Sequence, residues 1–417
     1  MDPQPAKPAM PQILSQRVAG AGLAGFARGR AEAGLTDAVL HAAKRVLLYR
    51  LASSADGLTQ AEGRQALEQA CARAPRGAPD QARAGIWWTR ERTTVAAATA
   101  INHQTCQLHP HGATHMGSLY APSRLLLPAL LAHAEAGGCG GRALLQALAT
   151  GIEVELAAAA AQAATPPSGA DDARWRTAAT AIAAAAARCH LDALDAAATA
   201  RALQAACGDD AALLERIAAQ LPGAGQAWRL QALALHCRPA PLIALAPIEA
   251  ALALRAQAAG RAVARLELAL SHQAWRALQA RPPGAGGRAA DLRHGLAASW
   301  HCARFTLDEW RPEVLADPAV GALRERIELV PDAAVGDVDG CVLTVHYADG
   351  SSQRERVEAA LGCPREPLRD SQLAELFRAA ADDLVLPRRA GEILYAVWGL
   401  EQAAEVGTLV SLLHRPD

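Results

Sequence analysis

Apolar residues recur every three or four positions through the first half of the chain, a spacing typical of amphipathic helices. Two sets show it: Val39, Ala43, Val46, Leu47 and Leu51, and Leu144, Leu145, Leu148 and Ile152. The alanine runs at 157–161 and 183–187 favour helices that pack closely, because their side chains are small. The pattern predicts a large all-α helical domain at residues 13–234, preceded by a disordered tail at 1–12.

The pattern changes after residue 234. Val263–Leu270 and Arg326–Val330 alternate between apolar and polar residues, as strands do. Val342–Tyr347 is joined through Ala348–Gly350 to the stretch at 352–358, which is a hairpin signature. We therefore predict a smaller α+β domain with an antiparallel sheet at 235–366, inserted as a lid, and helices at 367–417 that return to the helical domain. The fold class is mostly α, and the cleft under the lid is the expected ligand site.

The amino-acid composition argues against nucleic-acid-binding, membrane-bound and secreted proteins. With 41 Lys+Arg against 42 Asp+Glu, the chain lacks the positive charge that nucleic acid or an anionic membrane would attract. Nine scattered cysteines without a C-x-x-C pair, and an N-terminus without a signal peptide, predict a cytoplasmic protein with reduced thiols. The longest alanine-rich apolar runs are shorter than the roughly 18 residues of a membrane span. Lys7 and Lys44 are the only lysines, so lysine chemistry is unavailable beyond Lys44.

The densest polar cluster is Asn102–His115, which contains four of the thirteen histidines. Cys106, His109, His111 and His115 are residue types that bind zinc or iron, although their spacing fits no standard zinc pattern. Three interpretations remain open for this loop: a metal site, a surface or core role for the histidines, and an active-site loop.

Several passages resemble the MmgE/PrpD family. Leu127–Ala136, Gly141–Leu145 and Gly151–Val154 are similar to the family's central helical pair with its Gly-x-Glu-Val ending. Leu315–Val320, followed by Arg326–Ile327, resembles the family's Asp-Pro-x-Val segment before the sheet. The order of helical body, inserted lid and returning helices is also the family's. The resemblance extends over most of the chain and rests on the order of these motifs.

The resemblance implies a dehydratase-like carbon–oxygen lyase, or a related decarboxylase or epimerase, that moves a proton next to a carboxylate of a small polycarboxylate. It also implies a homodimer that binds a small carboxylate metabolite. No cofactor and no metal are expected to be required. Such chemistry needs a positioned acid or base, and cations that hold the carboxylates.

The family's motifs map onto two groups of positions in this sequence. The catalytic candidates are His115, His111, His109 and Thr114. The substrate-binding candidates are Asn102, His236, Arg238 and His294. Arg238 and His236 lie where the family has a lid lysine, and His294 corresponds to its lid tyrosine. An arginine holds a carboxylate through two parallel hydrogen bonds but does not exchange its proton at ordinary pH.

The chain also departs from the family's pattern. Acidic residues and histidines of the family's loop are replaced here, and both of its site lysines are absent. Thr114 has the alternative role of a helix cap, and Glu153 is expected to be structural. Two functional hypotheses follow: a lyase-like enzyme with a remodelled site, and a non-catalytic paralogue that binds a ligand or pairs with an active subunit.

Overall fold

The structure, a computed structural model, describes residues 22–29, 35–75, 81–109, 112–163, 170–208, 210–223, 225–279 and 288–414. The chain divides into two compact units. Unit 1 is drawn from Met1–Gln107, Gly117–Gln231 and Phe377–Asp417, and unit 2 from Leu108–Met116 and Ala232–Leu376. The predicted tail at 1–12 and His111 lie outside the described residues.

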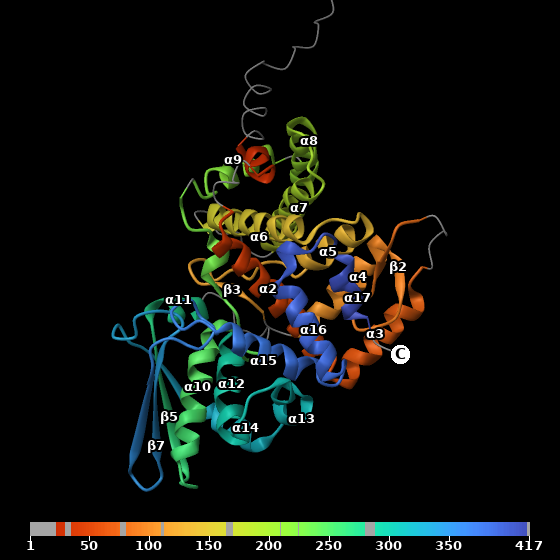
Figure 1. The fold of residues 1–417 in the computed structure, drawn as a ribbon. Coiled ribbons are helices and arrows are strands. Elements are labelled where there is room, and N and C mark those ends of the chain that lie inside the picture. The colour runs from red at the N-terminus through yellow and green to blue at the C-terminus, as the bar shows by residue number, and fades with distance from the viewer. Residues whose placement is uncertain are drawn as a thin grey trace, which may run out of the picture. The chain divides into compact units, whose positions relative to one another are not determined.

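Unit 1 is built mainly from helices that pack on a long central one, α6, which lies beside α7 (Figure 1). Its longer helices are α2 (Asp37–Gly57), α3 (Ala61–Arg73), α4 (Val95–Gln107), α5 (Leu126–Ala136), α6 (Gly141–Ala163), α7 (Ala170–Leu191), α8 (Ala196–Cys207), α9 (Ala211–Ala218), α16 (Pro387–Trp398) and α17 (Gly407–Leu413). Helix α15 (Asp370–Ala381) spans the division between the units, and short 3-10 turns are η2 (Arg229–Ala232) and η4 (Leu400–Gln402).

The small residues of α6 and α7 bring these helices together, as the alanine runs predict. A Cβ atom on Gly151 would lie only 2.9 Å from the Cβ of Ala187, so a larger residue would push the two helices apart. By length and composition, Gly141–Gln162 is also apolar enough to cross a membrane. However, 83% of its most apolar stretch is buried, as expected of a core helix.

Unit 1 is not purely helical, which corrects the all-α prediction. Strands β1 (Arg83–Gly85) and β2 (Arg92–Thr94) form an antiparallel ribbon between α3 and α4. Strands of three residues are too short to show an alternating pattern, so the sequence gives no periodic signal for them.

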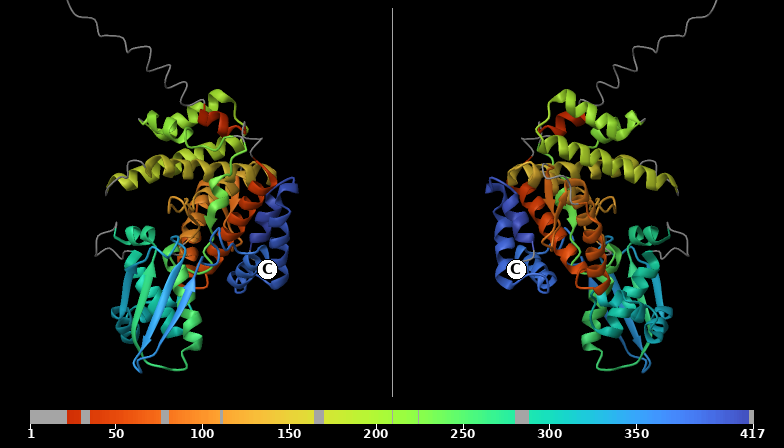
Figure 2. Two further views of the ribbon diagram at one scale, coloured as in Figure 1. Left: turned by 90° about the vertical axis from the view of Figure 1, so that its left-hand side faces the viewer. Right: turned by 90° about the vertical axis from the view of Figure 1, so that its right-hand side faces the viewer.

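Unit 2 contains a four-stranded sheet in the order β6-β5-β7-β8. Its strands are β5 (Val263–Leu270), β6 (Ile327–Pro331), β7 (Cys341–Tyr347) and β8 (Ser352–Val357). Its helices are α10 (Leu242–Gln257), α11 (His272–Gln279), α12 (Arg288–Cys302), η3 (Leu307–Trp310), α13 (Pro312–Leu315) and α14 (Pro318–Glu325). Helices α10 and α12 lie on one face of the sheet (Figures 1 and 2).

The sheet is mixed, which corrects the antiparallel prediction. The pairs β5–β7 and β7–β8 are antiparallel, as the hairpin signature predicts, but β5 and β6 are parallel. The physical reason is the connection: the helices α11 to α14 separate β5 from β6, and a long helical crossover returns the chain in the same direction.

Candidate functional site

A short strand pair joins the histidine-rich loop to the segment before α10, within unit 2. Strand β3 (Thr114–His115) pairs antiparallel with β4 (Leu233–Ala234), so that Thr114 faces Ala234 and His115 faces Leu233. The pairing continues through the backbone N–H of Met116, which donates to the carbonyl of Ala232 at 3.4 Å. Two groups of predicted site residues that are more than a hundred positions apart in sequence therefore share one unit.

The loop residues differ in exposure. His109 and Thr114 are buried, and His115 is half-buried. Thr114 lies on a strand and not at a helix start, so the helix-cap alternative is wrong; its hydroxyl donates to the carbonyl of Gly112 at 3.5 Å. His111 is not described. His109, Thr114 and His115 thus lie in the same unit as His236, Arg238 and His294.

The segment before α10 presents one histidine and one arginine. The Nδ1 atom of His236 lies 2.9 Å from the carbonyl oxygen of Ala240. Because a carbonyl only accepts, Nδ1 carries the proton in this contact. Arg238 is half-buried, and within the described part of the chain its Nε has no hydrogen-bond partner and its guanidinium no ion pair. A buried N–H of a cation without an acceptor is costly, which marks Arg238 as a place for an anion.

His294 on α12 contacts Trp310, which in turn contacts the segment that carries Arg238. Its ring centroid is 5.1 Å from that of Trp310, whose indole N–H donates to the carbonyl of Pro239 at 2.6 Å. The Nε2 atom of His294 donates to the carbonyl of Glu309 at 2.6 Å. Trp310 thereby connects His294 to the residue that follows Arg238.

The environment of His294 keeps its ring neutral. Burial lowers its pKa, while the hydrogen bond to the Glu309 backbone acts in the opposite direction. Since Nε2 donates, Nδ1 carries the lone pair, and Nδ1 is buried without a partner among the described residues. A neutral imidazole with a free lone pair can accept a hydrogen bond from a hydroxyl group.

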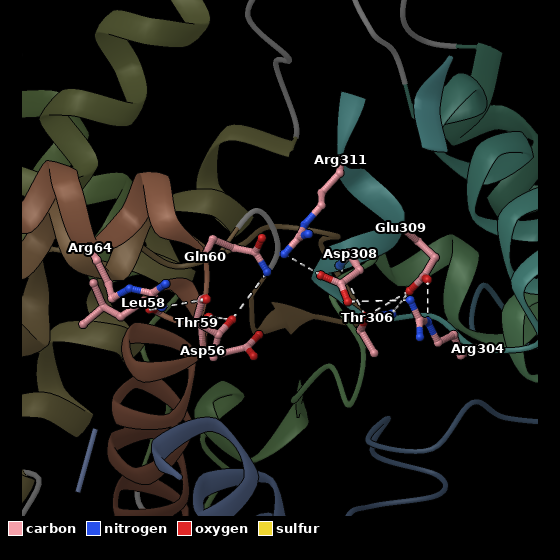
Figure 3. A network of polar contacts seen from close by, with 10 residues as sticks. All are labelled: Asp56, Leu58, Thr59, Gln60, Arg64, Arg304, Thr306, Asp308, Glu309 and Arg311. Carbon is pink, nitrogen blue, oxygen red and sulfur yellow. Dashed lines mark hydrogen bonds and ion pairs between the residues drawn. The ribbon is translucent and has the colours of Figure 1, made fainter. Parts of the chain in front are cut away.

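The Glu309 region is held by its own polar network. Its carboxylate accepts from the Nε of Arg304 at 2.9 Å and from the backbone N–H of Thr306 at 2.6 Å (Figure 3). Arg311 forms an ion pair with Asp308 at 3.0 Å in the same network. These contacts fix the backbone carbonyl to which His294 donates.

Sequence reasoning missed Glu249, a half-buried acid on α10. Its Oε1 accepts from the backbone N–H of Leu361 at 2.9 Å, and Arg238 acts on its charge. Burial raises the pKa of Glu249, whereas the Leu361 hydrogen bond and the charge of Arg238 lower it. One feature of the sequence could have indicated Glu249: it is a single acidic residue within the apolar stretch Leu242–Leu254.

Asn102 lies in unit 1 and has a well-defined structural role there. Its side-chain oxygen accepts from the backbone N–H of Trp87 at 2.9 Å, and its amide nitrogen donates to the carbonyl of Gly85 at 3.0 Å. These two hydrogen bonds hold the end of β1 against α4. A substrate contact by Asn102 stays a prediction.

The metal interpretation gains no support. Among the described residues, which do not include His111, no group of three or more metal-binding side chains is found. Burial raises the pKa of the Cys106 thiol to about 12.

Unit 1 contains a separate cavity of about 690 Å³. Its wall includes Leu58, Cys71 and Trp88, together with the charged residues Arg64 and Glu91. Arg64 is already used, because it donates to the carbonyls of Leu58 and Thr59 (Figure 3). None of the predicted site residues that the structure describes lines this cavity.

Comparison with known proteins covers nearly the whole chain. The model of the MmgE/PrpD N-terminal domain matches residues 21–238, and that of the MmgE/PrpD C-terminal domain matches residues 239–402. A cis-aconitate decarboxylase-like protein of Aspergillus oryzae is 27% identical over 153 residues. That match covers 35% of this chain and 31% of the relative, so it reaches less than a third of the relative's length.

Proposed function

Because this chain belongs to the MmgE/PrpD family, we propose that it is a lyase-like enzyme that acts on a small polycarboxylate by moving a proton next to a carboxylate. The observation that carries the proposal is Arg238, a half-buried cation with an unpartnered Nε in the described part of unit 2. The name of the Aspergillus relative supports a carboxylate as the substrate class.

Arg238 holds a substrate carboxylate in this proposal. The planar guanidinium matches the two carboxylate oxygens, and a charge-assisted hydrogen bond of this kind contributes about 1.5–3 kcal/mol. Arg238 cannot also move the proton, because guanidinium stays protonated. The proton therefore needs a different group.

His115 is the acid or base of the proposed reaction, with His109 and His111 as its neighbours in the loop. An imidazole titrates near neutral pH and can both remove and return a proton. The pairing of β3 with β4 supports this role, since it ties His115 to the strand that leads to His236 and Arg238. Thr114 completes the set of proposed contacts from this loop.

His236 and His294 line the carboxylate end of the proposed site. His294 offers a neutral Nδ1 that accepts from a substrate hydroxyl, which is the group a dehydratase expels. We further propose a cytoplasmic homodimer that needs no metal or cofactor for this chemistry.

The test is turnover of 2-methylcitrate, citrate and cis-aconitate by the purified protein, with His115→Ala as the variant. We expect turnover of at least one of these acids and its loss in His115→Ala, with ligand binding retained. If the wild type binds one of the acids but converts none, the enzyme proposal fails and the non-catalytic paralogue replaces it. If His115→Ala keeps full activity, the role of His115 is wrong.

A further inference from the structure

A tight turn at residues 360–366 holds the segment that carries Arg238. The backbone N–H of Leu235 donates to the carbonyl of Gly362 at 2.8 Å, and the thiol of Cys237 donates to the carbonyl of Leu361 at 3.3 Å. Gly362 has a φ of +94°, and a Cβ atom there would lie 2.1 Å from the carbonyl oxygen of Leu235. Only glycine allows this approach, so the turn and the segment are closely fitted.

Glu249 anchors this turn from α10. Its Oε1 accepts from the backbone N–H of Leu361 at 2.9 Å, next to the residue that Cys237 contacts. Arg238 directly follows Cys237, whose thiol contacts the same residue, Leu361, as the Glu249 carboxylate. The charge of Arg238 lowers the pKa of Glu249, yet the two side chains form no ion pair among the described residues. Arg238 therefore has a counter-charge nearby, and its Nε remains available.

The other titratable groups around Glu249 come from three elements. Cys237 precedes α10, Cys341 lies on β7, and Cys363 and Glu366 belong to the turn. Burial and the negative charge of Glu366 raise the pKa of Glu249, while the Leu361 hydrogen bond and Arg238 lower it. The three thiols have raised pKa values and are neutral near pH 7, mainly because they are buried. Arg238 is thus the cation that favours the ionised form of Glu249.

We propose that Glu249 is the counter-charge that sets the affinity of Arg238 for a carboxylate, and that Glu249 takes up a proton from solvent when Arg238 binds one. A bound carboxylate places a second negative charge beside Glu249 and engages Arg238. One carboxylate arrives, up to one proton passes from the solvent to Glu249, and no bond of the ligand changes. The inference rests on the proposed function in taking a carboxylate as the ligand of Arg238.

The first test needs no ligand. Carbon NMR of the full-length protein, labelled at the glutamate carboxyls, follows the titration of Glu249, and its signal is assigned by its absence in Glu249→Gln. We expect the pKa of Glu249 to be higher in Arg238→Gln than in the wild type, because the favourable cation is gone. An unchanged pKa would overturn the inference whatever the substrate is.

The second test is calorimetry with cis-aconitate in two buffers of different ionisation enthalpy, which measures the protons taken up on binding. We expect a fractional uptake by the wild type near pH 7, none by Glu249→Gln, and several-fold tighter binding by that variant above pH 7. Glutamine keeps the hydrogen bond to Leu361, so the turn stays in place. Glu358→Gln, an exposed position in the same unit, is the matched control and should behave as the wild type.

The outcomes separate the two proposals. Proton uptake that persists in Glu249→Gln would overturn the role of Glu249 and leave the lyase proposal intact. If proton uptake is lost in Glu249→Gln but no acid is converted, the coupling between Glu249 and Arg238 stands and the lyase proposal fails.

Discussion

Two acids, one in each unit, have different surroundings. In unit 1, Glu155 is fully buried and accepts hydrogen bonds from the Tyr120 hydroxyl at 2.8 Å, the Ser123 backbone at 2.9 Å and the Thr180 hydroxyl at 3.2 Å. In unit 2, Glu249 is half-buried and accepts one hydrogen bond among the described residues, from Leu361. Arg238 lies near Glu249 without pairing with it.

The difference separates a structural acid from a functional one. A buried carboxylate whose two oxygens both accept hydrogen bonds from the protein holds the fold together. Where a carboxylate has one partner and a nearby arginine is unpaired, the positive charge of the arginine can bind a ligand. Glu153, with its contacts to Arg229 and Leu230, belongs to the structural kind, as expected from the sequence.

The largest effect on stability is expected for Glu155→Ala. The change leaves the Tyr120 and Ser123 donors unsatisfied and removes the counter-charge near the buried Arg50. We expect a loss of about 3–5 kcal/mol in the free energy of unfolding, measured by urea titration. Glu249→Gln should lose less than about 1 kcal/mol, because its hydrogen bond to Leu361 remains. Equal losses would erase the distinction between the two acids.

Arg238→Ala should have the largest effect on binding. Losing one or two charge-assisted hydrogen bonds weakens the binding of a carboxylate by about 10- to 100-fold in Kd. The free energy of unfolding should change little, because the side chain of Arg238 makes no hydrogen bond or ion pair in the described part of the chain. Isothermal titration with cis-aconitate measures the first quantity and urea unfolding the second. A stability loss as large as that of Glu155→Ala would make Arg238 structural.

Gly362→Ala tests the turn behind Arg238. A methyl group would collide with the Leu235 carbonyl in addition to the strained φ of +94°, so we expect both lower stability and weaker carboxylate binding. Gly350→Ala is the matched control: its φ is +84°, but a Cβ there meets no atom within 4 Å. The control should lose only the roughly 1–2 kcal/mol of the left-handed conformation. If the two variants bind the carboxylate equally well, the turn does not contribute to the site.

The smallest effect is a pH dependence from His294. Its folded pKa lies below the unfolded value of 6.5, so the unfolded state binds more protons and stability rises with pH through that window. The contribution is complete above about pH 6.5 and is lost as the pH falls toward the folded pKa. Wild type should therefore lose more stability than His294→Gln between pH 7.5 and 5.5 in urea titrations. An identical loss would show that His294 does not titrate in this range.

Some elements were predictable because their signal is local. Strand β5 begins and ends where the alternation does, and the Asp349-Gly350 pair correctly placed the β7–β8 hairpin. Helix α10 continues through Pro247, because burial in the unit outweighs the cost of proline.

The site was less predictable because its contacts are long-range. No local pattern indicates that Trp310 donates to Pro239, that Gly362 meets Leu235, or that β3 pairs with β4. The family's motifs pointed to His236, Arg238 and His294, but they carried no signal for Glu249, which became visible only through its contact with Leu361.

The most direct test of the central claim is a crystal structure of the protein with cis-aconitate bound. We predict that a carboxylate of the ligand lies within hydrogen-bonding distance, about 2.7–2.9 Å, of the Arg238 guanidinium. A ligand bound in the unit 1 cavity beside Trp88, with Arg238 making no contact to it, would contradict the account.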